Sequence, residues 1–196
     1  MILPIVAYGD PVLKKVGEEI DEDYPDLKQL IASMWDTMYK ASGVGLAAPQ
    51  IGKSIRLFIV DASPFADDEE YSEDDRKIFK DFKKVFINPY IVEEEGKEWT
   101  FNEGCLSIPE IREDVNRKPD ITINYLDENF VEHEETYTGI PARIIQHEYD
   151  HIDGVLFTDR ISPLKKRVLK KKLANIAKGN IDVRYKMKFP LLKTRK

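Results

Sequence analysis

The segment TGIPARIIQHEYDHIDG, residues 138–154, constrains the fold more than any other part of this 196-residue chain. Its apolar residues recur at helical spacing, Pro141 falls in the first turn and Gly154 suits the far end, so we predict a helix. Thr138 stands where a capping residue belongs. The helix carries much apolar surface, from Ile144, Ile145, Tyr149 and Ile152. We therefore expect it to be buried, with the rest of the chain packed around it.

The same segment contains HEYDH, in which His147 and His151 are four residues apart and Glu148 follows the first histidine. Residues at this spacing lie on one face of a helix, so both imidazoles can bind one metal ion. Catalytic zinc sites take three protein ligands and keep a position for water, whose pKa the ion lowers toward about 7. A nearby carboxylate then accepts the proton. Two histidines at this spacing could also be core or surface residues whose hydrogen bonds are satisfied without a metal. HExxH on an apolar helix, however, predicts a catalytic metal site.

The third ligand decides the class of metal site. One metalloprotease group continues as HExxHxxGxxH, and this chain follows that pattern to Gly154 but has Phe157 at the last position. His133 lies among acidic residues on an expected exposed edge, and a distant glutamate stays open as an alternative. Cys105 in NEGCLSIP is the better candidate, because its thiolate would complete a Cys-His-His set. As the one cysteine of the chain it excludes an internal disulfide, and we expect a cytoplasmic protein.

Periodicity elsewhere predicts two more helices, at residues 25–40 and from residue 162 to about 178. A short apolar run at 54–60 predicts a strand, and β-branched and aromatic residues punctuated by turn formers predict more strands between 85 and 137. Helices and strands without a βαβ rhythm indicate an α+β fold. We expect mixed or antiparallel β-sheets packed around the central buried HExxH helix, with an N-terminal helix and a C-terminal helix.

We expect one catalytic domain in residues 1–180, with an exposed acidic insertion at about 61–81, and a basic C-terminal tail at 181–196. From residue 165 to the end, thirteen lysines and arginines face one acid, which gives about +12. The net charge of −6 then leaves −18 for the rest of the chain. This basic end favours either a polyanionic partner, such as a ribonucleoprotein, or a solvated helix face followed by a frayed end. The sequence has no apolar run long enough to cross a membrane.

Three separate motifs, together with the opening ILPIVAYGDPVLKK, resemble the bacterial peptide deformylases. The motifs are GVGLAAPQIG (43–52), which we expect to form a loop, EGCLSIP (103–109) and QHEYDHIDG (146–154). The resemblance covers roughly residues 2–175. It implies an enzyme that hydrolytically removes the formyl group from the N-terminal formyl-methionine of nascent chains.

The resemblance also implies roles for individual residues. The metal ligands would be Cys105, His147 and His151. The catalytic groups would be the Glu148 carboxylate as general acid and base, the Gln50 side-chain amide and the Leu106 backbone N–H. The substrate-binding residues would be Gly43, Val44, Gly45, Arg112 and Ile145. For Gln50 a bond to its own loop, and for Arg112 a surface charge, stay open as alternatives. Asp150 and Asp153 could orient the ligating imidazoles or solvate the helix end.

One divalent metal ion is expected, Fe(II) in the native protein, with Zn, Ni or Co accepted by the same ligands. The expected partners are nascent formyl-methionyl peptides and, through the basic C-terminal helix and tail, the ribosome. We expect neither membrane binding nor sequence-specific nucleic-acid binding. One alternative is an HExxH metallopeptidase that cleaves internal bonds. Another is a ribosome- or RNA-binding module with a structural metal site, which would need a fourth ligand that these motifs do not supply.

Overall fold

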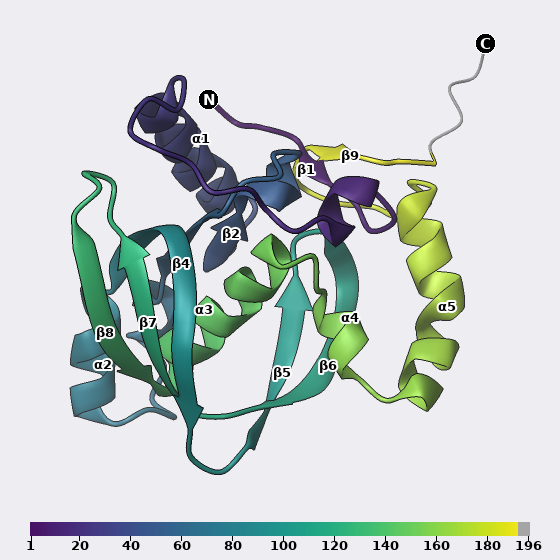
Figure 1. Cartoon of the computed structure of the whole chain (residues 1–196). Helices are drawn as coiled ribbons and strands as arrows, with labels where there is room; N and C mark the ends of the chain where they lie inside the picture. The colour runs from purple at the N-terminus through teal and green to yellow at the C-terminus, as the bar shows by residue number, and fades with distance from the viewer. Residues whose placement is uncertain (192–196) are drawn as a thin grey trace.

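The computed structural model describes residues 1–191, which form two main sheets and a small third one (Figure 1). The larger sheet consists, in spatial order, of β2 (Gly45–Ala47), β3 (Leu57–Asp61), β4 (Lys83–Glu95), β7 (Asp120–Leu126) and β8 (Glu132–Thr138). All four of its pairings are antiparallel. A second antiparallel sheet pairs β5 (Trp99–Cys105) with β6 (Ile108–Arg117). The third pairs β1 (Ile5–Val6) in parallel with β9 (Met187–Lys188), so the two ends of the chain meet.

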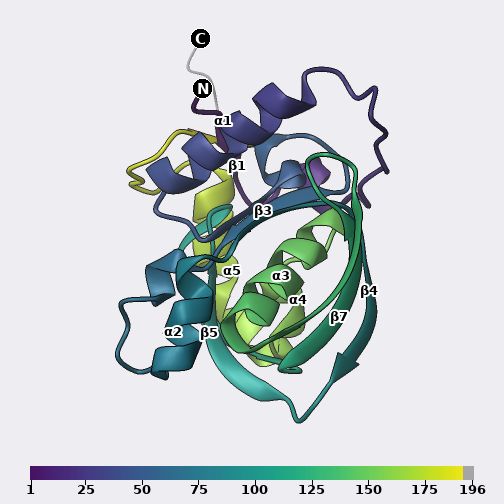
Figure 2. The same ribbon diagram turned by 90° about the vertical axis from the view of Figure 1, so that its left-hand side faces the viewer.

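Helices fill the space between and around the sheets. They are α1 (Leu27–Lys40), α2 (Glu73–Lys80), α3 (Gly139–Ile152), α4 (Phe157–Arg160) and α5 (Pro163–Ala177). Three short 3-10 helices join them, at Pro11–Lys14, Ala48–Ile51 and Ser63–Phe65. Figures 1 and 2 show α3 enclosed between the larger sheet and β5–β6. Helix α1 lies on the side of the larger sheet that faces away from α3, and α5 lies at the edge of the molecule beside β6. The HExxH segment therefore occupies the centre of the fold.

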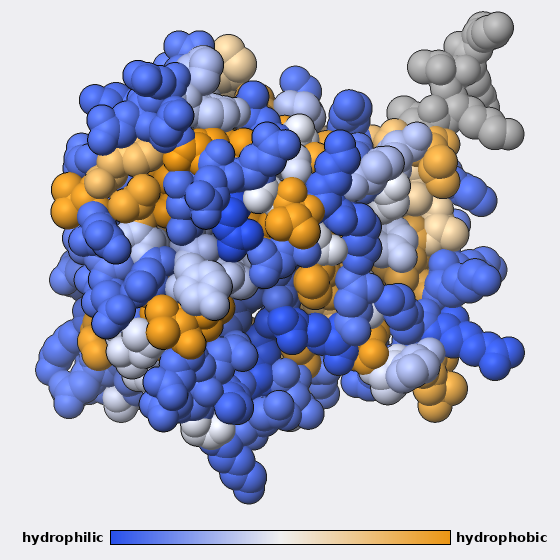
Figure 3. Space-filling view, in the orientation of Figure 1, coloured by the Kyte–Doolittle hydropathy of each residue, from blue (hydrophilic) through white to orange (hydrophobic). Residues whose placement is uncertain are grey.

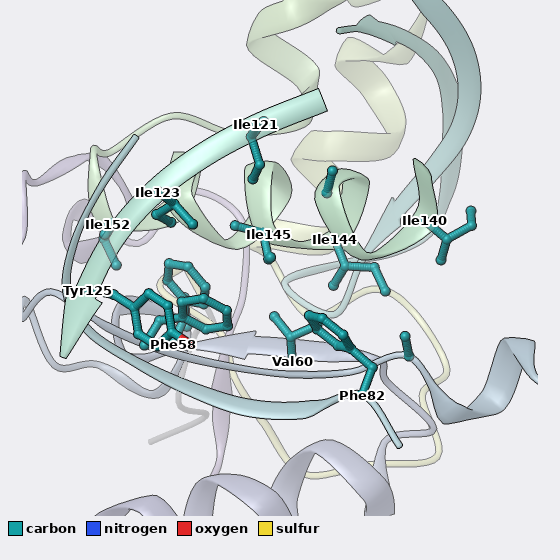
Figure 4. Close-up of a cluster of buried hydrophobic side chains, with 14 of the residues drawn as sticks. Phe58, Val60, Phe82, Ile121, Ile123, Tyr125, Ile140, Ile144, Ile145 and Ile152 are labelled. Atoms are coloured by element: carbon teal, nitrogen blue, oxygen red, sulfur yellow. The ribbon is translucent and has the colours of Figure 1, made fainter. Parts of the chain in front are cut away.

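The core around α3 explains why the segment is helical and buried. Figure 4 shows Ile140, Ile144 and Ile145 of this helix together with Phe58 and Val60 of β3 in one cluster, and strand β7 adds further side chains. Ile145 is fully buried. Full burial of one such side chain contributes about 1.5–3 kcal/mol.

Strand β3 connects two hydrophobic clusters because successive side chains point to opposite faces of a strand. Phe58 and Val60 face α3, whereas Leu57 and Ile59 face the cluster that holds Met34 and other residues of α1. Since both faces are covered, the strand reads as the nearly continuous apolar run seen in the sequence. The three predicted long helices and the α+β fold are confirmed.

One local prediction was wrong, because residues 43–52 are not simply a loop. Gly45–Ala47 forms strand β2, which pairs with Phe58, Ile59 and Val60 of β3, and a 3-10 helix follows at once. Three residues are too short for a pattern of strand periodicity, so this pairing depends on the neighbouring strand. Thr138 occupies the N-cap position of α3, but its side chain makes no capping hydrogen bond.

The acidic insertion and the chain end both pack against the body. Within residues 61–81 the helix α2 buries Phe79, and Asp61 is buried as the last residue of β3. Beyond Gly179 the chain returns to β1 through β9. The last basic residues of the predicted tail, Lys193, Arg195 and Lys196, lie outside the described residues. Within residues 1–191 no helix is both long and apolar enough to cross a membrane.

Candidate metal centre and active site

Three metal-binding side chains meet where the end of β5 approaches α3. Cys105 is the last residue of β5, and His147 and His151 lie one turn apart on α3. One donor atom from each side chain lies within 4.8 Å of those of the other two. Cys105 Sγ is 3.2 Å from His151 Nε2. The structure thus brings together the three residues that the sequence predicted as ligands.

The donor set and its spacing fit a divalent metal ion. Bonds of about 2.0–2.3 Å to a tetrahedral ion place ligand atoms about 3.3–3.6 Å apart, close to the Cys105–His151 separation. His147 Nδ1 lies 2.9 Å from Glu103 Oε2, so its Nε2 remains for an ion. A carboxylate behind a ligating imidazole fixes its tautomer and ring orientation. One thiolate and two imidazoles suit Fe(II), Zn(II), Ni(II) or Co(II).

Glu103 is the centre of a buried ionic network that sequence reasoning missed. It is 3% exposed and accepts hydrogen bonds from Arg117 Nε (2.7 Å), Arg117 Nη2 (3.0 Å) and Arg143 Nη1 (2.9 Å). Burial disfavours its ionised form, but the hydrogen bonds from Arg117 and His147 outweigh burial and hold the pKa of Glu103 well below its usual range. The carboxylate therefore stays charged while it orients His147.

The helix aspartates do not contact the imidazoles, which corrects the suggestion that Asp150 and Asp153 orient them. Asp150 instead accepts from Arg117 Nη1 at 2.8 Å and from Arg160 Nε at 2.5 Å. Asp153 accepts from Arg56 Nη1 at 2.7 Å. On the helix, residue 150 lies about 60° and residue 153 about 120° round the axis from residue 147 at 100° per residue, and both carboxylates are bound by arginines. They therefore anchor α3 to neighbouring segments.

Glu148 lies buried beside the two histidines, and its Oε2 has no hydrogen-bond partner among the described residues. Burial raises the pKa of Glu148 to about 7. A β-carbon at position 45 would lie 2.8 Å from Glu148 Cγ, so glycine at that position leaves the space that this side chain fills. Such a carboxyl group can exchange protons near neutral pH.

Gln50 approaches the metal centre from the 3-10 helix after β2. Its Oε1 accepts a hydrogen bond from the Ala47 N–H at 2.8 Å, and its Nε2 lies 3.4 Å from both Cys105 Sγ and Ser107 Oγ. Gln50 therefore makes the hydrogen bond within its own segment and also contacts the ligand Cys105. Because the local bond occupies the oxygen, the amide N–H donors face Cys105.

A cavity of about 540 Å³ opens onto these groups. Its lining includes these predicted site residues: Gly43, Val44, Gly45, Gln50, Cys105, Leu106, Arg112, His147 and Glu148. Arg112 is held by Asn102 Oδ1, which accepts from its Nε at 3.0 Å. Ile145 requires a correction, because Ile144 lines the cavity in its place while Ile145 faces the core (Figure 4). Adjacent helical residues point about 100° apart, and the sequence alone does not say which one faces the cavity.

Several cavity residues lie in segments that the sequence motifs do not cover. Phe65 comes from the acidic insertion and meets Tyr71 and Phe79 edge-on, with ring centroids 6.1 and 6.5 Å apart. Tyr185 comes from the chain end. His133, by contrast, does not belong to the ligand group. It lies on edge strand β8, where its Nε2 is 3.1 Å from Asp127 Oδ2. The candidate ligand group among residues 1–191 therefore has three members.

The comparisons with known proteins agree with one another. The family model described as polypeptide deformylase matches residues 2–167. A peptide deformylase of Christiangramia forsetii is 66% identical over 190 residues, covering 97% of each chain. One from Flavobacterium johnsoniae is 61% identical over 193 residues, covering 98% of each. A crystal structure of a peptide deformylase from Legionella pneumophila shares 38% identity, with a TM-score of 0.76, and the match covers 89% of this chain and 95% of that one.

Proposed function

The chain belongs to the polypeptide deformylase family, and on this premise we propose which of its residues carry out the reaction. It is a metal-dependent enzyme that removes the formyl group from the N-terminus of nascent peptides. The overall hydrolysis adds water to the formyl carbon, breaks its bond to nitrogen and leaves formate and a free amine.

The ion is held by Cys105, His147 and His151, and Glu103 fixes the orientation of His147. When bound, a divalent ion activates water at neutral pH and polarises the scissile carbonyl. Among the divalent ions that one thiolate and two imidazoles accept, we propose Fe(II) as the native metal. Rapid loss of activity in peroxide, with protection by replacement of Fe(II) with Ni(II), is the expected sign of Fe(II).

Glu148 accepts a proton from the attacking water and returns it to the leaving amine nitrogen. Its burial beside His147 and its raised pKa suit both directions of transfer. The Gln50 amide and the Leu106 N–H donate hydrogen bonds to the oxyanion that develops on the formyl oxygen. Gln50 is oriented for this role by the bond from Ala47 N–H to its Oε1.

The peptide lies along the outer edge of β2. This strand ends the larger sheet, and Gly43, Val44 and Gly45 line the cavity, so an extended peptide can pair with it as a further strand. Ile144 takes the place of Ile145 in the pocket for the methionine side chain. Arg112 lies at the exposed end of the cavity, where later residues of the peptide leave it.

The observation that carries these assignments is the buried Glu148 carboxyl beside three converging metal-binding atoms. Replacement of Glu148 by Ala should reduce formate release from a formyl-methionyl peptide by about 10²–10⁴-fold while one metal ion per chain is retained. The matched control Glu113→Ala, which removes a half-buried carboxylate that pairs with Lys165 at 2.9 Å, should keep full activity. Full activity of the Glu148 variant, or cleavage only of internal peptide bonds, would contradict the assignment.

We assign the ribosome as a docking partner for α5. Figure 3 shows hydrophilic side chains with apolar patches among them over α5. Lys170, Lys171 and Lys172 are exposed on this helix, as are Leu164 and Val168 at 71% and 73%. Basic side chains around apolar contacts suit a polyanionic partner. An enzyme docked on the ribosome would act in the cytoplasm, on chains as they emerge.

Cosedimentation with ribosomes tests this partner. Charge reversal of Lys171 and Lys172 to glutamate should sharply weaken binding at low salt, whereas the matched reversal of Lys77 and Lys80 on α2 should have no effect. Equal binding by both variants would exclude α5 as the docking surface. Turnover of free formyl-methionyl peptides should be the same in all of them.

A further inference from the structure

The turn that joins β5 to β6 is held from several sides, and one of the contacts comes from the end of the chain. Tyr185 Oη donates a hydrogen bond of 2.7 Å to the Leu106 carbonyl. Leu106 follows the ligand Cys105 directly, and Tyr185 also lines the cavity. This tyrosine lies beyond residues 2–167, which the family model matches.

The small β1–β9 sheet fixes where Tyr185 stands. The N–H groups of Ile5 and Ala7 donate to the carbonyls of Lys186 and Lys188, both at 2.9 Å. Exposure alternates along the chain end, so Tyr185 and Met187 point toward the body, where both pack against the cluster around α1. The tyrosine ring is therefore positioned by backbone pairing and by packing.

The same sheet holds the other side of the turn. Tyr8, just after β1, donates its backbone N–H to the Ser107 carbonyl at 2.8 Å. Gln50 Nε2 lies 3.4 Å from Ser107 Oγ. Two successive carbonyls, of Leu106 and Ser107, thus accept hydrogen bonds from Tyr185 and Tyr8, which flank the two strands of the small sheet. The Leu106 carbonyl belongs to the peptide unit that it shares with the Ser107 nitrogen, and a peptide unit held at its carbonyl has little freedom to rotate. The Leu106 N–H belongs to the adjoining unit between Cys105 and Leu106, which is restrained because it lies between this held peptide and the ligand Cys105.

We propose that Tyr185 is a positioning residue for deformylation, which holds the peptide unit that follows the Leu106 α-carbon and thereby restrains the Leu106 N–H, in the unit before it, to point at the developing oxyanion. The claim rests on the proposed role of Leu106. Its consequence is that the chain end, brought in by the β1–β9 pairing, contributes to the rate of the chemical step. A preorganised donor costs no reorientation at the moment of reaction, whereas a loose one does.

The test compares Tyr185→Phe with Tyr90→Phe, which removes a hydroxyl from an exposed tyrosine of β4. Phenylalanine keeps the ring of Tyr185 in its packing and removes only the hydrogen bond. With formyl-methionyl peptide, Tyr185→Phe should lower kcat about fivefold, the rate equivalent of one neutral hydrogen bond, and leave KM unchanged. Tyr90→Phe should match the wild type in both constants. An unchanged kcat, or a rise in KM alone, would overturn the proposal.

A second readout does not depend on activity. The nitrogen of Ser107 belongs to the same peptide unit as the Leu106 carbonyl, so its NMR shift reports the bond from Tyr185. In the metal-free protein, Tyr185→Phe should shift the Ser107 signal and broaden the Leu106 amide signal through microsecond–millisecond motion. Unmoved signals would overturn the proposal. If the wild type lacked deformylase activity, the proposed function would fail while this measurement still reported on the contact.

Discussion

Replacement of Glu103 by Gln should weaken both the fold and the metal site. The carboxylate is 3% exposed and accepts from Arg117, Arg143 and His147. Glutamine has nearly the same shape but is neutral, and it substitutes an NH₂ donor for one of the two acceptor oxygens. That donor would face guanidinium or imidazole N–H groups, which are donors as well.

The expected loss in the free energy of unfolding depends on the partners that Arg117 and Arg143 retain. Arg117 retains Asp150 as a charged partner at 2.8 Å, whereas Arg143 retains the carbonyls of Trp99 and Val115. Loss of one member of a buried ion pair costs about 3–5 kcal/mol. Since part of the network survives, we expect a loss of about 3 kcal/mol in the free energy of unfolding. Loss of the group that orients a ligating imidazole reduces metal affinity about 10–100-fold.

Two measurements check this prediction. Urea unfolding of the metal-free protein gives the stability change, and competition with a chelator gives the metal affinity. The control is Glu113→Gln, which removes the charge of a 2.9 Å pair with Lys165 at the surface and should cost less than about 1 kcal/mol. If Glu103→Gln matched the control in both measurements, the network would not support the site as described.

Further predictions concern the cavity and pH. Ile144→Ala and Ile145→Ala should each destabilise the fold by about 2–5 kcal/mol, but only the first should raise KM, because only Ile144 lines the cavity; equal KM values would reject the corrected pocket. Phe65→Ala should raise KM about fivefold, since it removes an apolar wall of the cavity, whereas Ile78→Ala on exposed α2 should not. Burial opposes ionisation of Asp159, but hydrogen bonds from Lys14 and Lys166 lower its pKa from 3.8 to about 2. Because the pKa of Asp159 is lower in the folded protein than in the unfolded chain, its ionised carboxylate stabilises the fold at pH values above the unfolded pKa. Asp159→Asn should therefore be less stable than the wild type at pH 7, and the difference should disappear as the pH falls from about 4 to 2. A difference in melting temperature that does not change with pH would contradict this.

The parts of the fold that were predictable from sequence depend on local signals. The helix α3 follows from its isoleucine spacing, and α5 from Ser162, which caps it by accepting from the Lys165 N–H. The paired histidines fix their own relative position through helix geometry. The third ligand could be selected because Cys105 is the one cysteine of the chain.

The remaining site residues depend on contacts between distant segments. Glu103 is one of 36 acidic residues, and only its place two residues before Cys105 on the same strand face marks it as pointing into the site. Ile144 and Ile145 are equivalent in the sequence until the face of α3 that meets the cavity is known. Tyr185 reaches the site through the β1–β9 pairing, which joins residues about 180 apart and leaves no local pattern.

The central claim is that one sulfur and two imidazole nitrogens hold a divalent ion that keeps a position for solvent. X-ray absorption at the metal edge, on anaerobically purified active enzyme, measures this directly. We predict one sulfur at about 2.3 Å, two nitrogens at about 2.0–2.1 Å and at least one solvent oxygen. A spectrum without sulfur, or with four protein ligands and no oxygen, would contradict the account.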